Sequence, residues 1–340
     1  MKAQKTIYVT KTFNLMKHYK MVKTGKSICL PTIDFEGLMV GGIGTYYNNL
    51  AKLLSQNGWQ VVVLFHSYDD KDISKFAEKY YETYNIPIYN ANELCKESEK
   101  SLPEIWRDAN WFQARSHIFH EALQVLMKKY GYNFDLIEFP EWGGAGFIPV
   151  QMNKNFGSYR TSKIIVKLHG SSEWCNEANV QEWTSFDDLK LNYLERYAFE
   201  NADIQVSPTH HLLQWCSEHG WRVEPDACIC RYPVRLNLKY ELSKSLTKRK
   251  EIIFFGRFEE RKGVIEFIES LHYIKSIFPL FHRENNITFI GTEDRLSKSY
   301  ISDKLDGYEC NFFTFTRDEA VKYLAENARL VVIPSKLDNF

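Results

Sequence analysis

The feature that most constrains the fold is an alternation of short apolar strands with amphipathic helices. Residues 27–35, SICLPTIDF, and residues 61–65, VVVLF, are each typical of a buried strand. Between them lie a glycine-rich loop and a stretch that places apolar residues at i, i+3, i+4 and i+7, beginning at Tyr47. Strand, loop, helix and strand in this order form a βαβ unit with a right-handed crossover. The sequence therefore predicts an α/β fold with a parallel sheet.

The alternation continues and then starts afresh, which predicts two domains. Further strands are expected at 135–139, 163–170 and 203–208, whereas residues 91–111 are polar and predicted to be irregular. A basic stretch without apolar periodicity then precedes a new strand at 252–256. At 340 residues the chain is too long for one ordinary core. We expect an N-terminal extension at 1–26, a first domain at 27–240, a linker at 241–250 and a second domain at 251–340.

Composition excludes several function classes. Lys+Arg and Asp+Glu both number 43, so no overall charge attracts nucleic acid. No apolar run approaches the ~20 residues that cross a bilayer, and the basic first twenty residues lack the apolar core of a signal peptide. Seven cysteines at scattered positions fit a reducing cytoplasm. Cys228 and Cys230 lack zinc-site spacing, and we expect buried thiols on one face of a strand and no metal.

Two loops at predicted strand ends carry residues suited to an anionic ligand. The first, GGIGT at 41–45, leads into a helix whose free N–H groups suit a phosphate, although a plain tight turn fits equally. It is not the dinucleotide fingerprint, because Tyr47 holds the last glycine position, nor is it a P-loop. The second, GRFEERKG at 256–263, offers Arg257 and Lys262 to a pyrophosphate or forms a solvated turn.

Two further stretches, KLHGSSEW at 167–174 and EFPEWGGAG at 138–146, lie at the ends of predicted strands. His169 lies at the end of its strand, where it is either a ligand-facing residue or a hydrogen-bonded structural one. Glu141 and Trp142 in EFPEWGGAG could line a sugar site or form a rigid turn. The pairs His210–His211 and Asp187–Asp188 are interpreted as helix starts or surface pairs without chemistry.

Taken in order, these stretches resemble the retaining nucleotide-sugar glycosyltransferases of GT-B fold called glycosyltransferase group 1. The stretches are GGIGTYYNNLAKLLSQNGWQVVVL, EFPEWGGAG, KLHG, ADIQVSP, FFGRFEERKGVIEFIESL, FIGTE and VVIPSKLDNF. The resemblance implies two Rossmann-like domains that face across a cleft, the first for the acceptor and the second for the nucleotide-sugar donor. It also implies that no cofactor or metal is needed.

The resemblance further implies roles for individual residues. Gly41 and Gly42 would meet the donor phosphate through their backbone. Arg257 and Lys262 would hold the pyrophosphate and stabilise the leaving group, and Gly291 would lie near the base or ribose. His169 would position the donor sugar beside the reacting carbon, with Glu141 and Trp142 on the acceptor side.

The end of the sequence departs from the family pattern. Residues 330–333, LVVI, predict a buried parallel strand, and a Pro-Ser turn follows it. In the family this turn precedes two glutamates seven residues apart, the first of which contacts the donor sugar. Asp338 occupies the first acidic position, and the second would lie beyond Phe340. We therefore expect a donor domain cut short, weak activity in this form and self-association through the incomplete domain.

The sequence thus predicts a cytoplasmic enzyme that transfers sugar with retention to a glycan or glycolipid of the cell surface. The basic first twenty residues leave a peripheral contact with the inner membrane surface open. An alternative is a non-catalytic relative that binds a ligand or partner without turnover. An oxidoreductase is disfavoured by the missing dinucleotide fingerprint.

Overall fold

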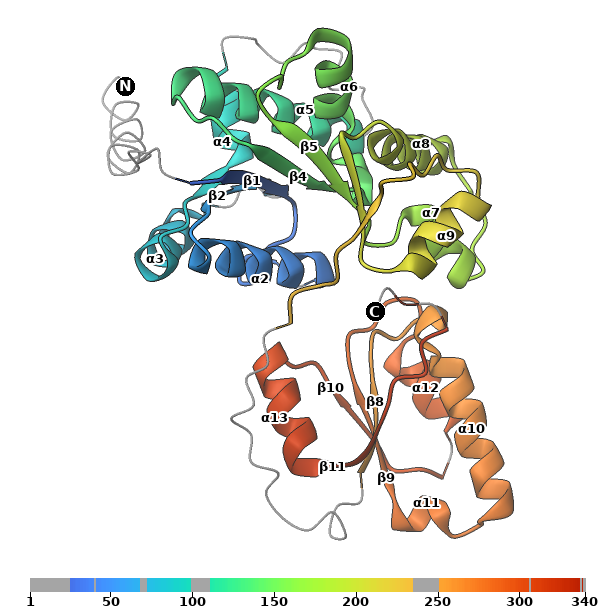
Figure 1. The fold of residues 1–340 in the computed structure, drawn as a ribbon. Helices are drawn as coiled ribbons and strands as arrows, with labels where there is room; N and C mark the ends of the chain where they lie inside the picture. Colours follow the sequence, from blue (N-terminus) through green and yellow to red (C-terminus); the bar gives the residue numbers. More distant parts are fainter. Residues whose placement is uncertain are drawn as a thin grey trace, which may run out of the picture. The chain divides into compact units, whose positions relative to one another are not determined.

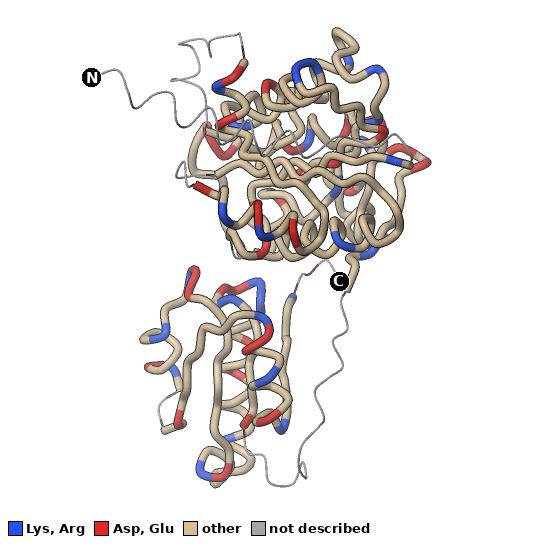
Figure 2. Tube along the Cα trace, turned by 90° about the vertical axis from the view of Figure 1, so that its left-hand side faces the viewer, with Lys and Arg blue, Asp and Glu red and all other residues tan. Residues whose placement is uncertain are grey.

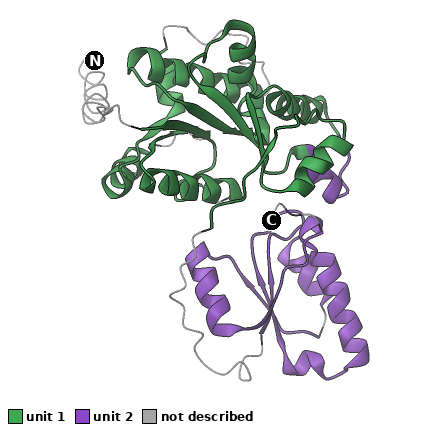
Figure 3. Ribbon diagram, in the orientation of Figure 1, with its two compact units in different colours: residues 1–172, 184–234, 339–340 green, residues 173–183, 235–338 purple. Residues whose placement is uncertain are grey.

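The computed structural model describes residues 25–39, 41–67, 72–98, 111–234, 251–305, 307–336 and 338. They divide into two compact units. The first contains the described residues up to 172 together with 184–234, and the second contains 173–183 together with those from 251 to 338 (Figure 3). The N-terminal extension up to residue 24 and the linker predicted at 241–250 lie outside the described residues. The domain limits stay a prediction.

The first unit is built on a parallel sheet whose strand order is β3-β2-β1-β4-β5-β6-β7. Helices α2 and α3 lie on one face of this sheet and α5 and α6 on the other (Figure 1). The predicted βαβ unit is confirmed, because β1 pairs in parallel with β2 from Ser27↔Gln60 to Thr32↔Phe65. The strands are β1 Ser27–Thr32, β2 Gln60–Phe65, β3 Ile88–Asn90, β4 Leu136–Pro140, β5 Lys163–Lys167, β6 Ile204–Ser207 and β7 Cys228–Ile229.

The helices of this unit bury the faces that the sequence pattern indicates. Tyr47 and Ala51 of α2 are fully buried against alternate residues of β1 and β2, such as Leu30 and Val63. The helices are α2 Gly42–Gln56, α3 Ser74–Tyr84, α4 Ala91–Lys96, α5 Trp111–Gln124 with its π-helical continuation η2 Val125–Lys129, α6 Phe147–Phe156, α8 Phe186–Glu200 and α9 His210–Glu218. Helix α7, Ser172–Ala178, crosses from the first unit into the second.

Local capping explains where several helices begin. The Ser185 side chain accepts from the Asp188 backbone and Asp188 bonds back, a capping box that starts α8. Thr209 caps α9 at His210, so both polar pairs start helices, as predicted. The prediction of an irregular 91–111 is wrong at its start, because the Asn90 side chain caps α4. Residues 99–110 lie outside the described part of the chain.

The second unit is built on a parallel sheet of order β10-β9-β8-β11. Alternate residues of β8 point to opposite faces, so Phe254 packs in the cluster that includes α10 and Ile253 in the cluster that includes α13. The elements are β8 Glu251–Phe255, η5 Glu260–Lys262, α10 Val264–Ile277, α11 Phe281–Glu284, β9 Asn286–Ile290, α12 Lys298–Lys304, β10 Cys310–Phe313, α13 Arg317–Asn327 and β11 Ala328–Val332.

Two expectations about burial are wrong. Strand β11 is parallel as predicted, but it lies at the edge of its sheet and leaves Leu330 53% and Ile333 61% exposed. Cys228 and Cys230 are exposed, because β7 is a two-residue strand at the edge of the first sheet. All seven cysteines are free.

Lys and Arg are interspersed with Asp and Glu along the described trace of each unit (Figure 2). Within the same residues, no helix combines the length and apolar character needed to span a membrane.

Candidate functional site

The glycine loop opens helix α2 at the carboxyl end of β1. Gly41 is the N-cap in extended conformation, and neither a side-chain cap nor an acidic residue occupies the first turn. A Cβ at Gly42 would meet nothing within 4 Å, so the backbone there is open to a ligand. A Cβ at Gly41 or Gly44 would instead overlap the carboxylate of Asp34. In this loop Gly41 and Gly44 are therefore required by packing, and Gly42 leaves space for a ligand.

Asp34 was not singled out from the sequence. It follows β1, and partial burial raises the pKa of its carboxyl, while the backbone N–H of Gly44 acts in the opposite direction. No composition or spacing signal marks it, because its importance depends on the glycines that close around it.

Glu141 lies at the end of β4 and is completely buried. Its Oε1 accepts a hydrogen bond of 2.6 Å from the backbone N–H of His169, at the end of the neighbouring strand β5. Burial raises the pKa of Glu141 to about 8, and the nearby Glu195 carboxyl adds to that rise. Trp142, the next residue, starts the short helix η3, Trp142–Gly144. Glu141 thus joins two loops, and its contact with an acceptor stays a prediction.

A second buried carboxyl ties the same two loops together. Glu195 of α8 accepts from the Gly143 N–H at 2.8 Å and from the Ser172 N–H and hydroxyl at 2.8 and 2.7 Å. Arg115 of α5 donates to the Gly143 carbonyl at 2.7 Å. Burial raises the pKa of Glu195 to about 7. Sequence reasoning missed both residues, since they lie far along the chain from the loops they hold.

His169 is surrounded by aromatic rings. Its Nδ1 lies 3.0 Å from the hydroxyl of Tyr232, and the two rings are nearly parallel, at 11°. The rings of Tyr46 and Tyr47 lie 4.9 and 6.0 Å from the imidazole. Burial and the charge of Lys167 hold the pKa of His169 well below its usual value. The imidazole is therefore neutral at pH 7.

Lys167, the last residue of β5, is buried within this cluster two residues before His169. Its Nζ donates to the Cys230 carbonyl at 2.7 Å and lies 4.5 Å from the Tyr46 ring centre. The Tyr46 hydroxyl donates to the buried Glu138 at 2.7 Å. Desolvation lowers the pKa of Lys167, and Glu138 opposes that change. This set of contacts fixes the segment that carries Tyr232.

In the second unit, Arg257 follows β8 at the carboxyl edge of its sheet. The guanidinium is half exposed and forms ion pairs with Glu259 at 3.1 Å and Asp294 at 3.2 Å. Glu259 is buried and also pairs with the buried Arg261 at 2.8 Å. A planar guanidinium held at the sheet edge with donors in reach of solvent is suited to an anionic ligand.

Lys262 and Asp338 meet at the same edge. The Lys262 Nζ lies 2.7 Å from the Asp338 carboxylate, and the Arg261 guanidinium is 3.8 Å away from it. Desolvation lowers the pKa of Lys262, while Asp338 counteracts it. The structure therefore brings together Lys262 and Asp338, which lie 76 residues apart in the sequence.

Two glycines of this edge are required by close backbone approach. A Cβ at Gly291 would overlap the carbonyl of Gly256, and one at Gly263 would overlap the carbonyl of Pro334. Gly263 also has a φ of +76°. Packing thus explains why a glycine stands at position 291. The position of Gly291 beside the base or ribose stays a prediction.

The segment 173–183 belongs to the second unit and contacts the turn before Lys262 through Asn179. Asn179 accepts from the Arg261 N–H at 2.9 Å and donates to Glu259 at 3.2 Å. It thereby fixes the turn that precedes Lys262. No sequence motif indicates this contact.

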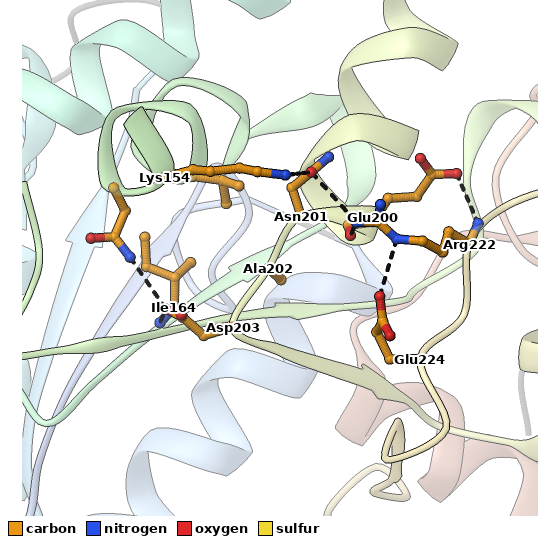
Figure 4. A pocket seen from close by; sticks show the side chains of 10 residues that line it. Lys154, Ile164, Glu200, Asn201, Ala202, Asp203, Arg222 and Glu224 are labelled. Atoms are coloured by element: carbon orange, nitrogen blue, oxygen red, sulfur yellow. Dashed lines mark hydrogen bonds and ion pairs between the residues drawn. The ribbon is translucent and has the colours of Figure 1, made fainter. Parts of the chain in front are cut away.

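A separate cavity of about 310 Å³ lies in the first unit, at the amino ends of β5 and β6 (Figure 4). His169 follows the opposite end of β5, so the cavity contains none of the predicted site residues. Among its lining residues, Arg222 forms an ion pair with Glu224 at 3.1 Å. Among the described residues no cluster of three or more His, Cys, Asp or Glu side chains could hold a metal.

Comparison with known families finds a match in the C-terminal part of the chain. Residues 241–340 match the family described as Glycosyl transferases group 1. This match covers less than a third of the chain. Arg257, Lys262, Gly291 and Asp338 all lie within the matched residues. No curated protein sequence matches the chain.

Solved structures similar to the chain show that its fold is that of GT-B glycosyltransferases. Sucrose-phosphate synthase from Thermosynechococcus elongatus has a TM-score of 0.63 at 18% identity, over 93% of this chain and 77% of that one. WaaG, a glycosyltransferase involved in lipopolysaccharide biosynthesis, has a TM-score of 0.59 at 14% identity, over 91% and 75%. The catalytic domain of starch synthase IV from Arabidopsis thaliana, bound to ADP and acarbose, has a TM-score of 0.54 at 14% identity, over 93% and 79%. The predicted fold class is confirmed.

Proposed function

We propose that the chain transfers a sugar from a nucleoside diphosphate donor to a hydroxyl of a glycan or glycolipid, with retention of configuration. The observation that carries this proposal is the set of Arg257, Lys262 and Asp338 at the carboxyl edge of β8 and β11, inside the group 1 domain. In open parallel sheets this edge is where ligands bind.

The second unit would hold the diphosphate. The Lys262 ammonium is largely buried and has a single carboxylate at 2.7 Å, so an incoming phosphate oxygen could share or replace that partner. The Arg257 guanidinium adds paired donors. As the bond between the sugar and the diphosphate breaks, negative charge grows on the leaving phosphate, and these two cations stabilise it.

The first unit would supply the groups beside the sugar. The open backbone at Gly42 offers the N–H groups of α2 to a phosphate, and His169 is held by its backbone contact with Glu141. In a retaining reaction of this kind, the acceptor oxygen bonds to the anomeric carbon on the face that the diphosphate leaves. The acceptor proton passes to the departing phosphate, so no side chain of the chain needs to form a covalent sugar adduct.

Calorimetric titration with ADP and UDP tests donor binding directly. We expect one of the two to bind the wild type, and Lys262→Ala and Arg257→Ala to weaken that binding about 10- to 100-fold, because each removes a charge-assisted hydrogen bond. Lys322→Ala, an exposed lysine on α13 in the same unit, is the control and should bind normally.

Turnover is then measured with the sugar nucleotides of the bound nucleoside. Sugar transfer that is lost in Lys262→Ala supports the proposal. Nucleotide binding without hydrolysis or transfer would favour a non-catalytic binding protein, and stabilisation by NAD alone would contradict the donor assignment.

A further inference from the structure

Tyr232, a residue that the sequence does not mark, lies beside the imidazole of His169. Tyr232 follows β7 in an irregular segment, and carbonyls on both sides of it accept hydrogen bonds from other elements. The Cys230 carbonyl accepts from Lys167 at 2.7 Å, and the Pro233 carbonyl accepts from Asn49 at 3.1 Å. The Tyr232 hydroxyl is thereby placed 3.0 Å from Nδ1 of His169.

The two rings are also held nearly parallel, one stacked on the other. The Tyr232 and His169 rings lie 5.4 Å apart at 11°, and the Tyr46 ring lies 5.2 Å from Tyr232 and 4.9 Å from the imidazole. Tyr46 itself is fixed by the bond of its hydroxyl to Glu138. The contact between Tyr232 and His169 is therefore set by packing on several sides.

We propose that the Tyr232 hydroxyl donates to Nδ1 of His169 and so keeps the imidazole in its Nε2–H form. A phenol is a better hydrogen-bond donor than acceptor, because its oxygen lone pair is delocalised into the ring, whereas the unprotonated imidazole nitrogen is a strong acceptor. The charge of Lys167 disfavours a second proton on the ring.

This arrangement defines what His169 can do in the proposed transfer, on which this step rests. A neutral imidazole with Nε2–H donates a hydrogen bond and cannot accept a proton at that nitrogen. His169 would then bind an oxygen of the donor sugar as a donor, and it would not act as the base that removes the acceptor proton. Tyr232 acts through His169 and is a positioning residue.

The test reads the tautomer directly and needs no turnover. The full chain is labelled with 15N-histidine, and the His169 ring is assigned by the signals lost in His169→Gln. Long-range proton–nitrogen correlation at pH 7 should show Nε2 protonated and Nδ1 bare. An Nδ1–H ring, or a doubly protonated ring, would overturn the inference whatever the activity.

Two tyrosine variants give a matched comparison. Tyr232→Phe removes the donor and should leave a mixture of both tautomers. Tyr47→Phe removes a hydroxyl that makes no hydrogen bond in the structure, from a ring 6.0 Å from the same imidazole, and should keep the wild-type spectrum. A wild-type spectrum in Tyr232→Phe would refute the role of Tyr232.

Kinetics separates this inference from the proposed function. Where sugar transfer is detected, Tyr232→Phe should lower kcat about tenfold with KM for the donor little changed, and Tyr47→Phe should leave both as they are. Equal loss in the two variants would contradict the positioning role. Absence of sugar transfer in the wild type would count against the proposed function. The 15N-histidine spectra would then still show which tautomer His169 adopts.

Discussion

At the scale of single residues, the buried carboxyl of Glu141 makes the stability of the first unit depend on pH. Its pKa of about 8 in the folded chain lies above the ordinary value near 4.5, so the folded state holds a proton that the unfolded state releases. The stabilisation is complete below pH 4.5 and is lost as pH rises through 8. Glu195 has a pKa of about 7 in the folded chain, so its titration also lowers the unfolding free energy as pH rises.

We therefore predict that Glu141→Gln reduces this decline. The amide stays neutral at every pH and its oxygen can still accept from the His169 N–H. Between pH 5 and pH 9 the wild type should lose about 1–3 kcal/mol more unfolding free energy than the variant. Urea unfolding at both pH values measures this, with exposed Glu82→Gln as control. Equal declines in wild type and Glu141→Gln would show that Glu141 titrates normally.

A second prediction at this scale concerns Asp338. Its carboxylate pairs with the Lys262 ammonium in the absence of ligand and would compete with a phosphate for it. Asp338→Asn removes a negative charge 2.7 Å from the Lys262 ammonium and so frees that cation for a phosphate. We expect the affinity for a free nucleoside diphosphate to rise about threefold to tenfold. Titration calorimetry measures the change against Asp318→Asn, an exposed acid on α13. Weaker binding in Asp338→Asn would mean that the carboxylate orients Lys262 and does not compete for it.

At the scale of elements, neighbouring glycines of the loop at 41–44 serve different purposes. Gly44 is required by packing, whereas Gly42 leaves space for a ligand. Gly42→Ala adds a methyl group where nothing lies within 4 Å, so the thermal-unfolding midpoint should stay the same while nucleotide-sugar turnover falls. Gly44→Ala drives its methyl group into Asp34 and the backbone of Phe35, and should cost about 2–4 kcal/mol of unfolding free energy. Differential scanning fluorimetry and the transfer assay distinguish the two. An unfolded Gly42→Ala would show that the open space is needed by the fold.

The elements themselves were predictable where their apolar pattern is strong. The pattern at 61–65 gave β2 within one residue, and the helix that begins near Tyr47 became α2, because each has one buried face. The apolar pattern wrongly predicted that β11 is buried, because its run of apolar residues is typical of a central strand. Sequence cannot distinguish an edge strand from a central one when no neighbouring strand order is known.

The site was predictable only in its parts that follow strands. Lys262 was proposed from its place in a loop, but its pairing with Asp338 required the sheet order that brings β8 next to β11. Glu195 and Tyr232 had no signal at all, since neither follows a motif and each acts on a loop distant in sequence. Long-range contacts of this kind follow from packing and not from local pattern.

At the scale of the whole molecule, each unit has its own sheet and its own hydrophobic clusters. Two cores of different size, one on seven strands and one on four, need not unfold together. The predicted cleft between the domains stays a prediction.

We predict that a nucleoside diphosphate stabilises one unit selectively. Differential scanning calorimetry should show two transitions, and hydrogen exchange of peptides from β1–β2 and from β8–β9 assigns each to its unit. Because Arg257 and Lys262 belong to the second unit, a bound nucleoside diphosphate at 100 times its Kd should stabilise that unit by about 2.7 kcal/mol. The corresponding nucleoside without phosphates should have little effect, since it lacks the groups that these cations bind. Protection confined to the first unit would place the nucleotide elsewhere and contradict the assignment of the donor site to the group 1 domain.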